Sequence, residues 1–161
     1  IEDVIKELLI LLNFKDSNGE GGDKPINVTY IVDSGGGCVA SVFKFVDMLE
    51  ILRRKRNITF TSIITGTAAS AATIMAIVAD KRLMTKNANA MIHELSVGSA
   101  YKSYTKIKSY EKHLADQHNR IVETYMKYTK KSRDQIEQLL VPDTWYTAEE
   151  YLANGFVDEL L

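Results

Sequence analysis

The sequence contains a serine, a histidine and an aspartate next to expected strand ends or turns. These are the three residue types that build an activated serine nucleophile. Ser70 lies after a strand and a glycine turn, His93 ends the short apolar run 90–92, and Asp143 follows Pro142 in a turn. A serine becomes a nucleophile when a histidine takes its proton and an acidic group orients that histidine. Sequence spacing does not show that the three meet. Plain structural roles therefore stay open: a packed small residue, a half-buried histidine and a turn or cap aspartate.

Glycine and small residues surround two of these positions. Residues 33–37 read DSGGG directly after an expected strand, and glycine allows positive φ and close approach of the backbone. The run predicts an anion cradle or half of an oxyanion hole, with a plain tight turn as the alternative. It is not a Walker loop, because no Lys-Ser/Thr pair follows at the required spacing. The N–H groups at the helix start near Ser70 favour negative charge in the same way.

The other histidines, the single cysteine and the basic run of the sequence indicate no metal or cofactor site. His113 and His118 are five residues apart in one expected helix, whereas metal ligands on one helical face stand about three or four apart. His118 falls on the apolar stripe and is expected to pack. The single cysteine, Cys38, excludes an internal disulfide and a cysteine-rich metal site. The basic run 53–56 ends a helix, where cations complement the helix dipole. We expect no metal and no cofactor.

Hydrophobic periodicity predicts the elements that must position these residues. The expected strands are residues 27–32, 58–64, 82–85 and 90–93, with a closing turn and short strand at 156–160. The expected helices are residues 1–12, 40–54, 69–79, 101–129, 132–140 and 148–153, with a loop at 13–25. A strand, a glycine turn and a helix follow one another twice, which predicts an α/β fold with a mostly parallel sheet flanked by helices. Sites in such folds lie at the carboxyl ends of strands, where both glycine turns fall.

Length and composition are those of one ordinary globular domain. The 161 residues are 45% hydrophobic and 25% charged, and such a chain buries about two-thirds of its unfolded surface. Twenty basic and twenty-one acidic residues leave a net charge of −1, which excludes a strongly basic surface for nucleic acid or anionic membrane. No apolar run approaches the roughly 20 residues of a membrane span. The chain shows no signal peptide and starts at Ile1 without a methionine, so we expect a missing upstream segment, and organellar targeting stays open.

The longest expected helix, residues 101–129, predicts a homo-oligomer. At 1.5 Å per residue it is about 40 Å long, whereas a compact chain of this size has a radius of gyration of about 15 Å. It carries more apolar surface than a projecting helix leaves in water: Tyr101, Tyr104, Ile107, Tyr110, Leu114, Ile121 and Tyr125. We expect the same helix of a second subunit to cover its outer half.

Five segments in order resemble motifs of the ClpP serine peptidases, and together they span nearly the whole chain. In this sequence they read DSGGG at 33–37, GTAAS at 66–70, MIH at 91–93, DTWYTAEE at 143–150 and NGFVD at 154–158. The family's motifs are, in the same order, Asn-Ser-Pro-Gly-Gly, Gly-x-Ala-x-Ser, Met-Ile-His, an aspartate before Ser-x-x-Glu-Ala, and Tyr-Gly-Leu-Ile-Asp. Each match alone is weak, but five in the right order over one domain are specific.

This resemblance implies a ClpP/crotonase-like fold as one peptidase domain over residues 1–161, with a projecting handle helix at about 95–130. It implies that Ser70 is the nucleophile, that His93 is the general base and later acid, and that Asp143 orients His93. The implied activity is that of a serine endopeptidase subunit. The family encloses its active sites in a chamber of two stacked seven-membered rings, which an AAA+ unfoldase supplies with protein.

The resemblance also implies the remaining site residues and the cellular setting. The N–H groups of Gly36 and Ala71 would form the oxyanion hole, and Gly37, Ser96 and Gly98 would contact substrate. From the same likeness we expect protein or peptide substrates, a homo-oligomer, an AAA+ unfoldase as candidate partner and a cytoplasmic location. We expect no nucleic-acid or membrane partner.

Departures from the family motifs concern substrate alignment more than the three catalytic positions. Gly35 replaces the usual proline, Thr67 stands where glutamine is common, and Ala71 stands where methionine follows the serine. The glycine-rich strand that aligns substrate is reduced to Gly98 and small neighbours, and we expect the N-terminal axial segment to be missing. The divergence suits a phage or viral ClpP-like peptidase, such as a capsid or prohead maturation peptidase in the host cytoplasm.

Three other interpretations have to be weighed. A peptidase of the signal-peptide-peptidase class pairs serine with lysine, and the available histidine and aspartate argue against it. An inactive ring subunit of the same fold would lack the triad, whereas all three positions are filled. A crotonase-type acyl-CoA enzyme shares the fold and a glycine-rich oxyanion hole but needs no Ser-His-Asp set. Reaction with a serine-directed fluorophosphonate separates the peptidase from the last two.

Overall fold

The computed structural model of the chain describes residues 25–55, 57–98 and 103–161. The helix expected over residues 1–12 and nearly all of the loop expected at 13–25 lie outside the described residues. So do the first two residues of the helix expected at 101–129.

A six-stranded sheet forms the centre of the described structure. Its strands are β1 (Ile26–Ser34), β2 (Ile58–Ala69), β3 (Lys81–Met84), β4 (Asn89–Ile92), β5 (Thr144–Thr147) and β6 (Glu159–Leu160). The order is β5-β4-β2-β3-β6, and β1 also pairs with β2. The pairings of β2 with β1, β3 and β4 are parallel, as is that of β3 with β6, whereas β5 runs antiparallel to β4. The expected mostly parallel α/β sheet is confirmed.

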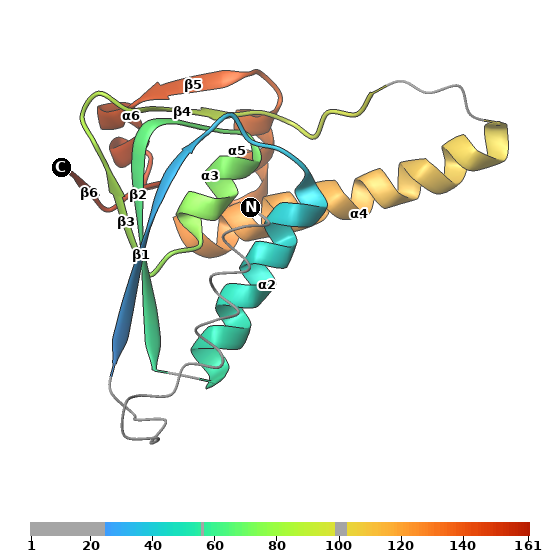
Figure 1. Cartoon of the computed structure of the whole chain (residues 1–161). Coiled ribbons are helices and arrows are strands. Elements are labelled where there is room, and N and C mark those ends of the chain that lie inside the picture. The colour runs from blue at the N-terminus through green and yellow to red at the C-terminus, as the bar shows by residue number, and fades with distance from the viewer. Residues whose placement is uncertain (1–24, 56, 99–102) are drawn as a thin grey trace.

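Helices cover the sheet, and the core lies between the two layers (Figure 1). They are α2 (Val39–Lys55), α3 (Ala71–Ile77), α4 (Tyr104–Thr129), α5 (Arg133–Leu140) and α6 (Ala148–Ala153). Apolar residues of α2 at helical spacing, Phe45, Leu49 and Leu52, are fully buried with Phe60 and Ile64 of β2. Truncating one such buried aromatic side chain to alanine costs about 3–5 kcal/mol, so this layer fixes the position of β2.

The strand expected at 58–64 was predicted too short, because β2 continues through Gly66 to Ala69. At Gly66 φ is +68°, which favours glycine, and a Cβ there would lie 2.7 Å from Asp33 Oδ1 and would displace that carboxylate. The same oxygen accepts a hydrogen bond from the Thr67 N–H at 3.0 Å. Pairing of residues 67–69 with β4 then keeps the chain extended. For this reason α3 begins at Ala71 and not at residue 69.

The sequence reading missed β5, although Thr144–Thr147 (TWYT) consists of β-branched and aromatic residues. The strand is only four residues long and lies between two helices, so no alternation was visible in the pattern. It pairs with β4 in antiparallel register, with Thr144 opposite Ile92. This pairing brings the residue before β5, Asp143, beside the residue after β4, His93.

The two ends of α4 have different surroundings (Figure 1). Its C-terminal half buries Ile121, Val122 and Tyr125 against the body, whereas the N-terminal half projects with Tyr104 77% and Ile107 55% exposed. Its 26 residues correspond to about 39 Å at 1.5 Å per residue, which agrees with a helix that overhangs the body. Across residues 25–55, 57–98 and 103–161, no helix has the length and apolarity needed to cross a membrane.

Candidate active site

Ser70 occupies the junction at which β2 ends and α3 begins. Its backbone has φ 55° and ψ −127°, a region that costs a non-glycine residue about 1–3 kcal/mol. The Ser70 N–H donates to the Met91 carbonyl of β4 at 2.9 Å, and this bond helps to hold the strained backbone. As the N-cap of α3, Ser70 precedes N–H groups that have no partner within the helix. The side chain thus stands at the carboxyl edge of the sheet, beside the first N–H groups of α3.

Gly36 packs directly against this junction. At Gly36 φ is +107°, and a Cβ there would lie 2.6 Å from Ser70 Cβ, 2.8 Å from the Ala69 oxygen and 3.2 Å from the Ala71 nitrogen. No side chain fits, and the absence of one lets the backbone of the DSGGG run approach the start of α3. The Gly36 N–H donates to Ser34 Oγ at 3.2 Å, so a hydroxyl of the same turn accepts from one of the two expected oxyanion donors.

His93 meets Ser70 from the end of β4. His93 Nε2 lies 2.7 Å from Ser70 Oγ, within the distance that a general base needs to take a hydroxyl proton. The histidine side chain is 20% exposed, so the ring is largely shielded from water. The parallel pairing of Ala69 with Met91 places the two strand ends side by side.

Asp143 lies on the other side of the histidine ring but at a longer distance. Its Oδ1 is 3.8 Å from His93 Nδ1, and its side chain is 75% exposed. This separation allows charge attraction to a protonated histidine, yet it exceeds the 2.7–3.2 Å range of an N–H···O hydrogen bond. The three residues are together in space, with one close contact and one loose one.

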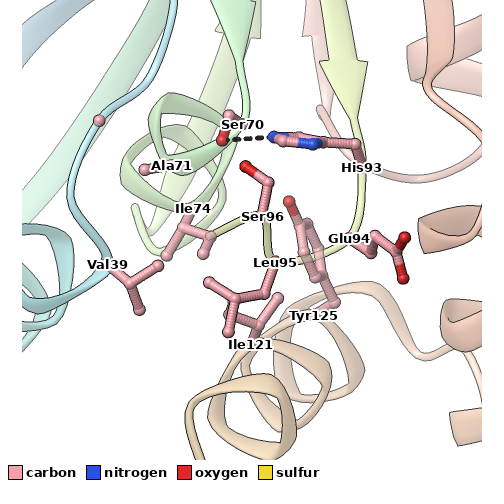
Figure 2. A pocket seen from close by; sticks show the side chains of 11 residues that line it. Val39, Ser70, Ala71, Ile74, His93, Glu94, Leu95, Ser96, Ile121 and Tyr125 are labelled. Atoms are coloured by element: carbon pink, nitrogen blue, oxygen red, sulfur yellow. Dashed lines mark hydrogen bonds between the residues drawn. The ribbon is translucent and has the colours of Figure 1, made fainter. Parts of the chain in front are cut away.

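A pocket opens from Ser70 and His93 toward α4 (Figure 2). Apolar side chains form its walls: Val39, Ile74, Leu95, Ile121 and Tyr125. Gly37 and Ser96, two of the three expected substrate contacts, also line it, whereas the third, Gly98, does not. The carboxylate of Glu94 points away from Ser70 (Figure 2). The pocket could take an apolar side chain next to a reacting carbonyl.

Sequence reasoning did not find the apolar walls of this pocket. They come from α2, α3, α4 and the segment after β4, so no single motif contains them. Ile121 and Tyr125 stood on the apolar stripe of the long helix, but periodicity indicated packing and not a substrate wall. Among the described residues, no group of three or more histidine, cysteine or acidic side chains could hold a metal ion.

Arg53 and Arg54, in the basic run at the end of α2, make hydrogen bonds and ion pairs. Arg53 Nη2 donates to the Val78 carbonyl at 2.8 Å and pairs with Asp80 at 3.2 Å. Arg54 pairs with Glu50 one helical turn away at 3.5 Å. The Arg53 contacts attach the helix end to the body, whereas the Arg54 pair lies within α2.

The sequence of the chain is similar to those of known proteins. The family described as Clp protease matches residues 1–161. The chain is 30% identical over 162 residues to the ATP-dependent Clp protease proteolytic subunit 1 of Chlamydia pneumoniae, covering 99% of this chain and 78% of that protein. Proteins with the same name from Protochlamydia amoebophila (30% over 141 residues; 86% and 66%) and Chlamydia abortus (28% over 137 residues; 83% and 69%) are also similar.

Proposed function

Because this chain belongs to the Clp protease family and is thus a serine peptidase, we propose that Ser70, His93 and Asp143 are its catalytic triad. In this proposal the enzyme cleaves peptide bonds in proteins or peptides through an acyl-enzyme. The observation that carries it is the 2.7 Å contact between His93 Nε2 and Ser70 Oγ. That contact lies beside a backbone that only glycine permits at Gly36.

The reaction begins when Ser70 Oγ attacks the scissile carbonyl carbon and His93 Nε2 takes the hydroxyl proton. The carbonyl π electrons move to oxygen, and the resulting oxyanion accepts from the N–H groups of Gly36 and Ala71. The C–N bond then breaks as His93 returns the proton to the departing amine. An ester on Ser70 remains, and water hydrolyses it by the same two proton transfers. Asp143 stabilises the imidazolium that forms in each half.

The Gly36 N–H has to be released from Ser34 before it can donate to the oxyanion. Ser34 Oγ accepts from the Gly36 N–H, so the substrate carbonyl competes with that hydroxyl. In this proposal the Ser34 side chain rotates away to free the donor, whereas Ala71, the first residue of α3, has no partner within the helix for its N–H. Two backbone donors then converge on one oxygen.

The apolar pocket would receive the side chain that precedes the scissile bond. Burying an apolar side chain there contributes about 25 cal/mol per Å² of surface, which favours substrates with a medium-sized apolar residue at that position. Gly37 and Ser96 at the pocket edge, with Gly98 farther along, would align the substrate backbone.

Assembly and cellular setting belong to the same proposal. The relatives are named as proteolytic subunits of ATP-dependent proteases, and the exposed Tyr104 and Ile107 of α4 leave apolar surface for a second subunit. We place this helix, as a handle, at the contact between two stacked heptameric rings of one-domain subunits, with an AAA+ unfoldase as partner and the cytoplasm as location. A phage-type maturation peptidase would use the same site.

The test is serine-directed labelling together with peptide hydrolysis. We expect the wild-type assembly to react with a fluorophosphonate and to cleave a fluorogenic peptide. Ser70→Ala should lose both activities, by at least about 10³-fold in rate, and keep its size in solution. Ser103→Ala, at the exposed start of α4, is the matched control and should label normally. Labelling that persists in Ser70→Ala would show that another serine is the nucleophile. A wild type that does not label would leave the inactive-subunit interpretation.

A further inference from the structure

A buried pair of hydroxyls lies beneath the nucleophile, outside the triad. Thr73 is in the first turn of α3, three residues after Ser70, and is fully buried. Its Oγ1 lies 2.5 Å from the Ser70 carbonyl oxygen and 2.5 Å from the Tyr125 hydroxyl. Tyr125 reaches this place from α4, and its side chain points from that helix toward the active site (Figure 2).

The direction of these hydrogen bonds follows from the number of protons. A carbonyl oxygen only accepts, so the single Thr73 hydroxyl proton is donated to Ser70. Thr73 Oγ1 must then accept from the Tyr125 hydroxyl. The Thr73 N–H also donates to the Ser70 carbonyl at 3.0 Å, so that oxygen receives two bonds from one residue. The result is a relay that runs from Tyr125 through Thr73 to Ser70.

The Ser70 carbonyl and the Ala71 N–H belong to one planar peptide group. Because that group is rigid and trans, fixing the direction of its oxygen also fixes the direction of its N–H. The Ala71 N–H is one of the two donors that we assign to the oxyanion hole. We propose that Thr73 and Tyr125 are positioning residues, which hold the Ser70–Ala71 peptide so that the Ala71 N–H points at the oxyanion. This inference rests on the proposed function.

The Tyr125 hydroxyl differs from those of two other tyrosines of the core. Among the described residues, the hydroxyls of Tyr146 and Tyr151 have no hydrogen-bond partner, whereas that of Tyr125 bonds to Thr73. Tyr125 is 2% exposed, and burial raises the pKa of its hydroxyl well above the usual range. It therefore keeps its proton, and can donate to Thr73, throughout the neutral range.

The test uses single-atom changes in the assembled enzyme. Thr73→Val removes the hydroxyl at nearly constant shape, and we expect kcat for a fluorogenic peptide to fall about tenfold with little change in KM. This is part of the loss of about 10²–10³-fold that follows complete removal of an oxyanion donor. Thr73→Ser keeps the hydroxyl and should stay within about twofold of wild type. Tyr125→Phe should lose about threefold, and adding it to Thr73→Val should cost little more, because the two act in series.

A second readout reports on the oxyanion hole itself. Ser70 Oγ adds to the carbonyl carbon of a peptide aldehyde as His93 takes its proton, which gives a tetrahedral hemiacetal whose oxygen occupies the oxyanion hole, whereas the matching peptide alcohol forms no such adduct. We expect Thr73→Val and Tyr125→Phe to weaken aldehyde inhibition in proportion to kcat/KM and to leave binding of the alcohol unchanged. The matched control is Ser62→Ala. It removes another buried hydroxyl bond to α3, from Ser62 Oγ to the Ala76 carbonyl at 2.8 Å, and should lower stability without changing either readout.

Each result decides for or against the relay. It is overturned if Thr73→Val keeps kcat within twofold of wild type, if aldehyde and alcohol affinities change together, or if Ser62→Ala loses as much kcat. Should Thr73→Val fail to fold, the aldehyde affinity of Tyr125→Phe decides: a loss supports the relay and no change overturns it. A wild type that neither labels with fluorophosphonate nor cleaves peptide contradicts the proposed function instead, which separates the two failures.

Discussion

The two sides of the His93 ring are built differently. On one side Nε2 lies 2.7 Å from Ser70 Oγ, between two strand ends that share a sheet. On the other side Nδ1 lies 3.8 Å from an Asp143 carboxylate that is 75% exposed. The first contact has the geometry of a working proton transfer, and the second has only that of a loose charge pair.

Backbone pairing accounts for this difference. Ser70 and His93 follow directly on β2 and β4, whose register is set by hydrogen bonds between buried strands, and the Ser70 N–H itself donates to Met91. Asp143 precedes β5, a four-residue strand that pairs only with β4 among the described strands. A side chain carried by the edge of a sheet and surrounded by water has more freedom than one held between strands. We therefore expect the contact between Ser70 and His93 to contribute more to catalysis than the contact between His93 and Asp143.

The largest effect is expected from the histidine itself. His93→Gln keeps a polar side chain of similar reach but cannot take up the serine proton, so kcat/KM for a fluorogenic peptide should fall by at least about 10³-fold. His113→Gln, on the exposed part of α4, is the control and should be unchanged. A loss of less than tenfold in His93→Gln would mean that another group acts as the base.

Next in size is the close approach of the glycine turn. Gly36→Ala would place a Cβ 2.6 Å from Ser70 Cβ and displace one or both oxyanion donors, so we expect about a 10²-fold loss of kcat. Gly35→Ala is the matched control, because a Cβ there meets nothing within 4 Å. If the two alanine variants behave alike, the packing of Gly36 against Ser70 has no catalytic role.

The loose side of the histidine should give a smaller effect. Asp143→Asn removes the charge that stabilises the imidazolium, and at 3.8 Å with strong exposure we expect a loss of about tenfold, well below that of a tightly bonded triad aspartate. Combined with His93→Gln it should add little, since both act through one ring. Asp116→Asn, exposed on α4, is the control. A loss as large as that of His93→Gln would show that Asp143 closes on the ring in the working assembly.

The smallest expected effect is on the free energy of unfolding. It concerns Asp158, whose carboxylate forms an ion pair with Arg82. The Arg82 guanidinium donates to both carboxylate oxygens of Asp158 and to the Tyr128 and Gly155 carbonyls. Hydrogen bonds from Arg82 hold the pKa of the Asp158 carboxyl below its usual range. A depressed carboxyl pKa stabilises the fold above the unfolded value of about 3.9, and this contribution is lost as pH falls through the folded value.

We expect Asp158→Asn to lower the thermal midpoint by a few degrees at pH 7, as a change of about 1 kcal/mol does in a domain of this size. The difference from wild type should shrink as pH falls below about 3.9 toward the lower folded pKa of Asp158, because the wild-type carboxyl then begins to take up a proton. Thermal unfolding followed by circular dichroism measures both. The control is Glu159→Gln, whose pair with Lys81 at 3.2 Å is more than half exposed on both sides and should contribute little. A constant difference between Asp158→Asn and wild type from pH 3 to 7 would contradict the ion-pair explanation.

The amino-acid sequence was sufficient to predict the parallel α/β sheet, most helices and the three residue types of the site. Those predictions depend on local patterns: apolar periodicity, glycine after strands, and short motifs in the right order. The prediction from the sequence was wrong where a contact between distant residues outweighed the local pattern. Gly66 looked like the end of a strand, but the Asp33 carboxylate and the pairing with β4 carry β2 on to Ala69.

The distances within the site were decided by the tertiary structure. Ser70 and His93 are 23 residues apart and Thr73 and Tyr125 are 52 apart, so no local pattern in the chain shows that their atoms meet. Hydrogen bonds form only within a few tenths of an ångström of their ideal length, and strand register and helix packing set that length. The same packing separates the close Ser70 contact from the loose Asp143 contact, although both partners were visible as residue types in the sequence.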